Sequence, residues 1–203
     1  MVCGGKSSRM GVAKLALPFG GETMLNRAVR VLAGALTPIV VVAAPEQELP
    51  ELPSYVEVVR DRAEGRGPLE GIAGGLRALQ GKCTAAYISS CDVPLLKPDF
   101  VCRLTSLIGD HDVVVPKDGK FFHPLAAVYR IGVLEQVEDL LANDQLRPFF
   151  LFQRVSTREI DVEVLREVDP NLDSLRNLNR PQDYYDALTS AGLSIPDGLD
   201  LPS

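Results

Sequence analysis

Apolar and polar positions along the chain follow two different patterns. Short runs of β-branched and other apolar residues alternate with longer segments whose apolar residues recur at helical spacing. A continuous apolar run is typical of a strand buried on both faces, and an apolar stripe is typical of a helix packed on one side. The pattern predicts strands over residues 38–44, 55–59, 85–89, 112–116 and 125–129. It predicts helices over residues 23–35, 68–79, 97–108, 131–143 and 181–191.

The order of these elements predicts the fold class. Strands and helices alternate over roughly 110 residues, which favours an α/β fold with helices on both faces of a sheet. A chain of 203 residues fits one such domain. We expect the domain to span residues 1–192, and we expect the tail over 193–203, rich in Pro, Gly and Asp, to be frayed.

The first strand of this pattern is short. The chain opens with Met1-Val2-Cys3 and continues directly into glycines, which leaves two or three residues for a strand. A strand normally supplies ~5–6 residues. We therefore expect either a stunted first strand or a natural start that lies upstream of Met1.

Composition narrows the class of partner. Apolar residues make up 46% of the chain and charged residues 24%, which excludes wholesale disorder. The net charge of −6 gives no general attraction to nucleic acid, and no apolar run approaches the ~20 residues of a membrane helix. The four cysteines form no C-x-x-C pair, so we expect neither a zinc site nor a disulfide framework. The expected compartment is the reducing cytoplasm.

The glycine-rich opening over residues 4–14 is the most informative stretch. It holds three glycines, two hydroxyls and three cations. Glycines let successive backbone N–H groups turn inward as a cradle for an anion, and Arg9 and Lys14 would neutralise phosphate oxygens. The spacing matches neither the P-loop nor the dinucleotide-binding fingerprint. The alternative interpretation is a surface loop with solvated basic residues.

Asp92 stands just past the strand predicted over 85–89. The carboxyl ends of parallel strands are where open α/β sheets bind ligands. A carboxylate at that place suits Mg²⁺, which often takes one or two carboxylates together with phosphate oxygens and waters. The alternative is a turn or cap residue ahead of Pro94. The residues alone leave both interpretations open.

Several blocks of the chain resemble the motifs of one enzyme family. They are Gly4-Gly5-Lys6-Ser7-Ser8-Arg9-Met10-Gly11 with Lys14, Gly67-Pro68-Leu69-Glu70-Gly71, Ser90-Cys91-Asp92-Val93-Pro94, His123-Pro124, and Asn177-Leu178-Asn179-Arg180-Pro181-Gln182-Asp183. The opening loop resembles that of sugar-nucleotide-type nucleotidyltransferases. The closing Asn-x-Asn-x-Pro block is similar, more narrowly, to the molybdenum cofactor guanylyltransferases. The blocks fall in the family's order and span nearly the whole chain.

The resemblance implies a three-layer α/β/α, Rossmann-like nucleotidyltransferase fold with a mostly parallel sheet. It also implies a reaction in which GMP passes from GTP to molybdopterin and pyrophosphate is released. Mg²⁺ would be the cofactor, and proteins that insert molybdenum or receive the cofactor would be the partners, with no nucleic acid and no membrane involved.

The resemblance assigns roles to individual residues. The catalytic residues would be Arg9, Lys14 and Asp92, with Asp92 also the metal ligand. The contacts to GTP would be Val2, Cys3, Gly4, Gly5, Lys14, Asp61 and Asp92. His123, Asn177 and Asn179 would line the acceptor side. For Asp61 the alternative is a surface ion pair with Arg60 or Arg62.

Three positions depart from the family's pattern. Arg180 replaces the usual threonine that caps the last helix, although Asp183 could serve the exposed N–H groups. Ala13 replaces an aspartate before the loop lysine, and Ala43 replaces an asparagine that contacts guanine. Because alanine has no side-chain hydrogen bond, the choice of base stays open. The alternatives are a cytidylyltransferase or related enzyme of the same fold, a non-catalytic nucleotide-binding protein, or an α/β domain that binds a protein partner.

Overall fold

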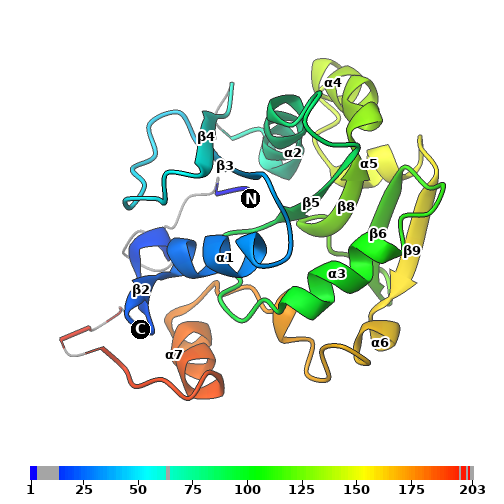
Figure 1. Cartoon of the computed structure of the whole chain (residues 1–203). Coiled ribbons are helices and arrows are strands. Elements are labelled where there is room, and N and C mark those ends of the chain that lie inside the picture. Colours follow the sequence, from blue (N-terminus) through cyan, green and yellow to red (C-terminus); the bar gives the residue numbers. More distant parts are fainter. Residues whose placement is uncertain (4–13, 63–64, 197, 200, 202–203) are drawn as a thin grey trace.

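The computed structural model describes residues 1–3, 14–62, 65–196, 198, 199 and 201. The strands are short and mostly of five residues: β1 Pro18–Phe19, β2 Glu22–Thr23, β3 Ile39–Ala43, β4 Val56–Arg60, β5 Ala85–Ser89, β6 Val113–Asp118, β7 Phe121–Phe122, β8 Ala126–Arg130 and β9 Thr157–Asp161 (Figure 1). The α-helices are α1 Met24–Ala33, α2 Gly67–Ala78, α3 Pro98–Ser106, α4 Leu134–Ala142, α5 Pro148–Phe152, α6 Val162–Leu165 and α7 Pro181–Ser190. Short 3₁₀ turns are η1 Lys14–Ala16, η2 Ile131–Val133 and η3 Asp173–Leu175. All ten predicted elements are therefore confirmed to within a few residues.

The principal strands run mostly in one direction. β3 pairs with β4 in parallel, and Val2 forms parallel bridges to Val42 of β3 and to Ser90 just after β5. In the second sheet β8 is antiparallel to both β5 and β6, so β5 and β6 share a direction, and β9 is parallel to β6. β8 and the short β7 run the opposite way. The expected mostly parallel sheet is confirmed.

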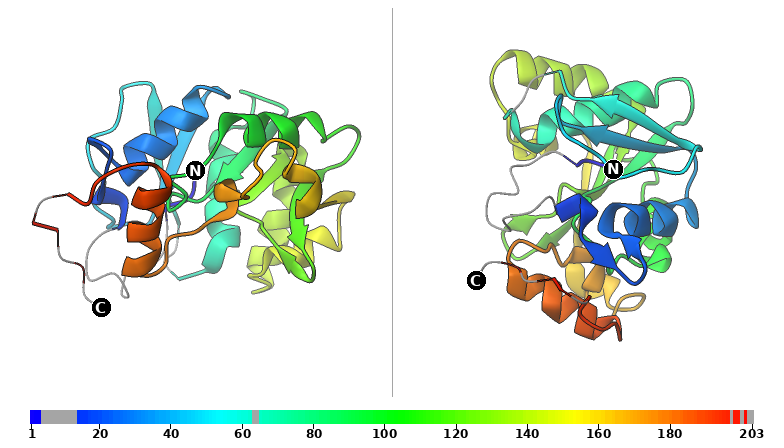
Figure 2. Two further views of the ribbon diagram at one scale, coloured as in Figure 1. Left: turned by 90° about the horizontal axis from the view of Figure 1, so that it is seen from below. Right: turned by 90° about the vertical axis from the view of Figure 1, so that its left-hand side faces the viewer.

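Alternate residues of the strands pack into two different cores, one on each face. Val41, Tyr87 and Val114 contribute to a cluster with residues of α1 and α3. Val42 and Ile88 contribute to the other cluster, with residues of α2, α4 and α5. Because strand side chains alternate between faces, this division makes a three-layer α/β/α arrangement (Figures 1 and 2).

A third, smaller cluster closes the end of the molecule near α7. Phe19, Met24 and Tyr184 are fully buried there, and Leu201 of the tail packs into the same cluster. The Tyr184 hydroxyl donates to the carbonyl oxygen of Pro18, which ties α7 to the β1–β2 hairpin. Figure 2 shows α7 beside this hairpin, away from the five-stranded sheet. Among the described residues no helix combines the length and the apolar character that a membrane span requires.

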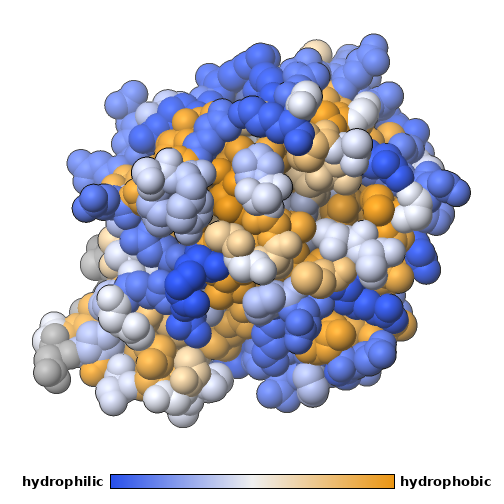
Figure 3. Space-filling view, viewed as in Figure 1, coloured by the Kyte–Doolittle hydropathy of each residue, from blue (hydrophilic) through white to orange (hydrophobic). Residues whose placement is uncertain are grey.

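The two sheets are joined by very little backbone. A cavity of about 220 Å³ lies between β3 and β5, lined by apolar residues of both strands and by Met1. Figure 3 shows apolar residues reaching the surface in the middle of the face that Figure 1 presents. The ammonium group of Met1 donates to the carbonyl of Val40 at 2.7 Å, and burial lowers its pKa. Val2 and Cys3 complete the junction, because their N–H groups donate to Ser89 at 2.7 Å and to Val42 at 2.8 Å.

Candidate active site

Asp92 lies at the centre of a hydrogen-bonded group just past the carboxyl end of β5. Its Oδ2 is 3.6 Å from Nζ of Lys14, and both side chains are largely shielded, with 14% and 15% exposed. Its Oδ1 accepts from the amide nitrogen of Asn177 at 2.8 Å and from the hydroxyl of Ser90. Together these contacts fix the orientation of the Asp92 carboxylate. The two predicted catalytic residues inside the described part of the chain are therefore adjacent.

Asn177 and Asn179 reach the same group from a distant part of the sequence. Lys14 donates to Oδ1 of Asn179 at 3.2 Å, so the lysine is held between an asparagine and Asp92. Leu178 between them is buried, and its N–H donates to the carbonyl of Asp92 at 3.0 Å. The alternation expected from strand-like spacing, with both asparagines on one side, matches these contacts. Three segments far apart in sequence thus converge on Asp92.

Asp183 supports the asparagines from the start of α7. Its Oδ2 accepts from the N–H groups of Asn179 and Arg180, both at 2.8 Å. A carboxylate in the first turn of a helix interacts favourably with the helix dipole as well. Asp183 therefore serves exposed N–H groups next to Arg180, as expected from the sequence.

The glycine-rich loop lies mostly outside the described residues, so Gly4, Gly5 and Arg9 cannot be placed. Val2 and Cys3 are described and are buried, with their backbone paired to the two sheets. Their side chains belong to the core, so the predicted contacts of Val2 and Cys3 with GTP would have to use their backbone.

Asp61 follows β4 and lies against α2. Burial, reinforced by the nearby Glu70 and opposed by Arg77, raises the pKa of Asp61 to about 6. Its Oδ1 is buried and has no hydrogen-bond partner among the described residues. A buried acceptor without a partner is costly, and a ligand hydroxyl or amide would satisfy it.

The alternative interpretation of Asp61, a surface ion pair with a neighbouring arginine, finds no support in these contacts. Arg60 donates instead to the carbonyls of Ala44 and Gln47, at 2.9 and 2.6 Å. Arg62 lies 3.8 Å from Glu138. Within the described part of the chain, no hydrogen bond or ion pair joins Asp61 to Lys14 or Asp92.

His123 lines a hollow next to the group. The hollow encloses about 200 Å³ and is bordered by Asn177, Phe122, His123 and Pro68, among others. Burial lowers the pKa of His123, and the nearby Asp118 partly opposes this, so the imidazole is neutral at pH 7. A neutral ring can both donate and accept hydrogen bonds at its edge. The histidine and one asparagine of the predicted acceptor side therefore share one surface.

Two residues at the site were not singled out from the sequence. The Ser90 hydroxyl holds Asp92, and the Gln47 side chain bridges the N–H of Ala44 at 3.1 Å and the carbonyl of Cys3 at 2.8 Å. Gln47 thus fastens the end of β3 to the residue that enters the glycine-rich loop. A single glutamine in a loop carries no pattern that could have indicated this role.

Asp92 and its neighbours suit a hard cation that takes most of its ligands from phosphate groups and water. No cluster of three or more His, Cys, Asp or Glu side chains capable of holding a metal occurs in the described ranges. Asp92 supplies oxygen atoms, which Mg²⁺ prefers, and Mg²⁺ commonly uses only one or two protein carboxylates with phosphates and water. A full protein cage is therefore not needed for such an ion.

The fold and this group of residues suit a ligand that carries phosphate groups. A shielded lysine lies beside a carboxylate just past the carboxyl end of β5, which is where open α/β sheets bind ligands. The sequence profile of the MobA-like NTP transferase domain matches residues 1–157. The chain belongs to that family.

Individual relatives agree with the assignment. A probable molybdenum cofactor guanylyltransferase of Mycobacterium avium is 38% identical over 147 residues, which cover 70% of this chain and 73% of the relative. The solved molybdopterin-guanine dinucleotide biosynthesis protein A of Archaeoglobus fulgidus superposes with a TM-score of 0.77 at 22% identity, over 94% of this chain and 96% of that one. A Mycobacterium tuberculosis protein solved in complex with manganese has a TM-score of 0.62 at 16% identity, over 93% and 96% of the two chains.

Proposed function

We propose that this enzyme transfers GMP from GTP to molybdopterin and releases pyrophosphate. The observation that carries the proposal is the convergence of Lys14, Asp92, Asn177 and Asn179 on one point. The first two residues belong to the nucleotide motifs and the last two to the motif of the molybdopterin branch. Relatives 35% to 38% identical carry the corresponding name, which supports this choice of substrates.

The reaction needs positioning and charge neutralisation more than covalent chemistry. The terminal phosphate of molybdopterin would attack the α-phosphorus of GTP in line, so that the bond to pyrophosphate breaks as the new one forms. Lys14 carries a charge that can neutralise phosphate oxygens, and Arg9 is proposed to add a second. Lys14 is held by Asp92 and Asn179 before any ligand arrives, which lowers the cost of ordering it.

Asp92 is the proposed ligand of Mg²⁺. When bound, the ion would neutralise phosphate charge next to Lys14. Asn177 and Ser90 both donate to Oδ1 of Asp92, so Oδ2, on the side of Lys14, has the fewer partners. The manganese complex of the Mycobacterium tuberculosis protein of the same fold makes a divalent ion a reasonable expectation here.

The remaining residues divide between the two substrates. Asp61, whose Oδ1 has no hydrogen-bond partner in the described ranges, is proposed to accept a hydrogen bond from the nucleotide. His123, Asn177 and Asn179 are proposed to contact molybdopterin, with the 200 Å³ hollow receiving part of it. The four free cysteines fit a reducing compartment, and we propose that the enzyme works in the cytoplasm with proteins that supply or receive its cofactor.

A panel of the four nucleoside triphosphates with Mg²⁺ and molybdopterin tests the proposal. We expect pyrophosphate release and a thermal shift with GTP to exceed those with the other three. Ligand at 100 times its dissociation constant should add about 2.7 kcal/mol of stability. A response to CTP that equals or exceeds the response to GTP would transfer the assignment to a cytidylyltransferase, because Ala43 lacks the guanine-contacting side chain. Binding without any pyrophosphate release would favour a non-catalytic protein.

Lys14→Ala tests the phosphate-binding role directly. The loss of a charge-assisted contact should cost about 1.5–3 kcal/mol of GTP binding or transition-state stabilisation. Lys120→Ala, on an exposed hairpin, is the matched control and should change neither. Unchanged turnover of Lys14→Ala with an unchanged melting temperature would show that Lys14 does not bind the phosphates of GTP.

A further inference from the structure

The asparagines of the site stand on a segment with little regular structure. Residues 169–180, here called the acceptor arm, connect α6 to α7 and contain only the short η3 turn. In Figure 1 the arm runs from α6, past the start of α3, to α7. Such a segment does not hold two amide side chains in place by its own backbone hydrogen bonds. Other contacts must therefore fix Asn177 and Asn179.

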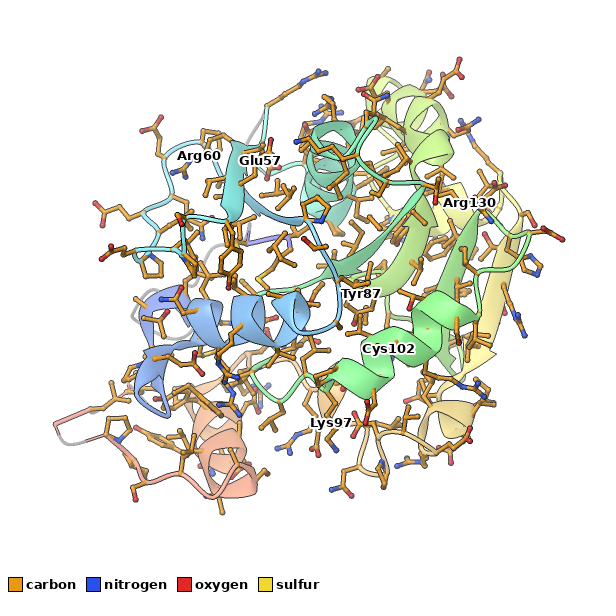
Figure 4. All side chains as sticks on the ribbon, viewed as in Figure 1. Glu57, Arg60, Tyr87, Lys97, Cys102 and Arg130 are labelled. Carbon is orange, nitrogen blue, oxygen red and sulfur yellow. The ribbon has the colours of Figure 1, made fainter. Side chains whose placement is uncertain are left out.

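The first of these contacts is an ion pair at the beginning of the arm, in which the carboxylate is buried and the lysine is partly exposed. Asp169 is 0% exposed, and its Oδ1 accepts from Nζ of Lys97 at 2.7 Å. Its Oδ2 accepts from the N–H of Ser174 at 2.8 Å. The N–H of Lys97 in turn donates to the hydroxyl of Ser174 at 3.1 Å, and Nζ of Lys97 is also 3.4 Å from Asp173. Figure 4 labels Lys97 at the start of α3.

The second contact lies at the other end of the same two segments. Leu178 donates to the carbonyl of Asp92 at 3.0 Å, and Asn177 donates to its carboxylate. Residues 92–97 and the acceptor arm therefore run antiparallel, fastened at 92 to 178 and at 97 to 174. Arg27 of α1 fixes the middle of the first segment, because its Nε donates to the carbonyl of Pro94 at 2.7 Å.

The electrostatics of the pair make it a firm attachment. Burial alone would raise the pKa of Asp169, but hydrogen bonds from Lys97 and Ser174 outweigh it and lower the pKa. The hydrogen bond from Asp169 is the main cause that raises the pKa of Lys97. Both groups are thus charged at neutral pH, and removal of Lys97 would leave the buried carboxylate of Asp169 with only the hydrogen bond from Ser174 among the described residues.

We propose that Lys97 and Asp169 are positioning residues that set the acceptor arm against Asp92 and thereby fix Asn177 and Asn179 for the acceptor. The inference rests on the proposed function for its catalytic consequence, but the attachment itself can be tested without it. Neither residue contacts Lys14 or Asp61, and the arm reaches Lys14 through Asn179, so the acceptor side should lose more than the nucleotide side when the pair is broken. This asymmetry separates a positioning role from a general loss of stability.

The test compares variants of the full chain in two measurements. Asp169→Asn keeps the shape but removes the charge, and Lys97→Met removes the partner. We expect each to raise the KM for molybdopterin at least tenfold, while the Kd for GTP rises by a smaller factor, because Asn179 also holds Lys14. Lys97→Arg keeps the charge and should restore most of the wild-type KM. Ser174→Ala, which removes one hydroxyl and no charge, is the milder variant should the others fold poorly.

Arg103→Met is the matched control. It breaks another ion pair of α3, between Arg103 and Glu167 at 3.3 Å, which is exposed and does not reach the acceptor arm. This variant should leave the KM for molybdopterin and the Kd for GTP unchanged. Any loss of melting temperature that it shows measures the purely structural cost of an α3 ion pair.

Hydrogen exchange of the peptide that covers 172–180 supplies the second measurement. We expect at least tenfold faster exchange there in Asp169→Asn and Lys97→Met, and no change in Arg103→Met. Unchanged exchange in Asp169→Asn would overturn the proposal, and so would an equal weakening of both substrates. Failure of the wild-type chain to transfer GMP would refute the proposed function alone, because the exchange experiment would still decide the attachment.

Discussion

The nucleotide half of the site and its acceptor half are held by different kinds of contact. On the nucleotide side, β3 and β4 meet the larger sheet through the backbone of Met1, Val2 and Cys3, beside a cavity of about 220 Å³. On the acceptor side, a five-stranded sheet carries β5, and the ion pair of Lys97 with the buried Asp169 fastens the acceptor arm. The comparison indicates that a few backbone contacts of the first three residues hold the first half, whereas charged side-chain hydrogen bonds hold the second.

Asp92 belongs to both halves, so its variant should have the largest effect. Asp92→Asn keeps the shape and one acceptor but loses the charge that pairs with Lys14 and that a metal ion needs. We expect GMP transfer to fall at least a hundredfold, which corresponds to about 2.7 kcal/mol of transition-state stabilisation. The free energy of unfolding should change by about 1 kcal/mol at most, since most hydrogen bonds of a turn survive.

Pyrophosphate release and urea unfolding measure the two effects of Asp92→Asn, and Asp99→Asn on the exposed first turn of α3 is the control. Partial recovery at raised Mg²⁺ or Mn²⁺ would sharpen the metal assignment. Near-normal transfer at ordinary Mg²⁺ would contradict it and leave Asp92 as a structural turn residue.

A pair of glycine variants on α2 tests the packing of the nucleotide half. A Cβ at Gly71 would lie 2.4 Å from Cγ1 of Val2, whereas a Cβ at Gly75 would meet Val42 at an ordinary 3.6 Å. Gly71→Ala should therefore destabilise the fold by about 1–3 kcal/mol and weaken GTP binding, because Val2 leads into the loop. Gly75→Ala should gain about 0.5–1 kcal/mol from helix propensity.

Urea unfolding and GTP titration of the two glycine variants provide the measurement, and each serves as the control for the other. Equal stability of the two would mean that the contact of α2 with Val2 is loose, and the contrast between the halves would then weaken.

Asp61 should make both the stability of the protein and its affinity for GTP depend on pH. Its folded pKa of about 6 lies above the usual 3.8, so the folded state binds the proton more tightly, and stability falls as pH rises between those values. Asp61→Asn should therefore be more stable than wild type at pH 7 by about 1 kcal/mol, discounted for partial solvent screening, and equal to it near pH 4. GTP affinity should fall in this variant, and in wild type below pH 6, if the ionised form accepts a hydrogen bond from the nucleotide.

Thermal unfolding and GTP titration across pH 4–8 measure both consequences, with exposed Asp110→Asn as the control. A stability difference that stays constant with pH would contradict the shifted pKa. Unchanged GTP affinity would remove Asp61 from the nucleotide contacts while leaving its burial as a structural fact.

The sequence predicted the parts of the molecule that repeat a pattern. Strands such as 39–43 are continuously apolar because both faces are buried, so periodicity alone places them. β9 was missed because it is an edge strand of residues Thr157–Asp161 with one buried side chain, Ile160, and therefore no apolar run. The helix α5, which begins at Pro148, was missed because five residues are too few to show a period.

The site was likewise predicted only where its residues stand in motifs. Lys14, Asp92, Asn177 and Asn179 stood in recognisable blocks, and the structure brings all four together. Lys97 and Asp169 are 72 positions apart, and neither stands in a motif. Their pairing depends on how two loops meet in space, and local sequence carries no signal of such a meeting.

The smallest expected effect concerns the far end of the acceptor arm. Arg180 precedes α7 with extended backbone angles suited to an N-cap, but arginine has no oxygen to accept from the first-turn N–H groups. Arg180→Thr adds a hydroxyl there and should raise the free energy of unfolding by about 0.5–1 kcal/mol. Arg180→Val, similar in shape but without the hydroxyl, should not. Because Asp183 already holds the backbone of Asn179 and Arg180, GMP transfer should stay within twofold in both variants. Urea unfolding and the pyrophosphate assay decide this. A larger change in transfer would mean that the arm is held from α7 rather than from Lys97 and Asp169, and the acceptor half would then have a different anchor.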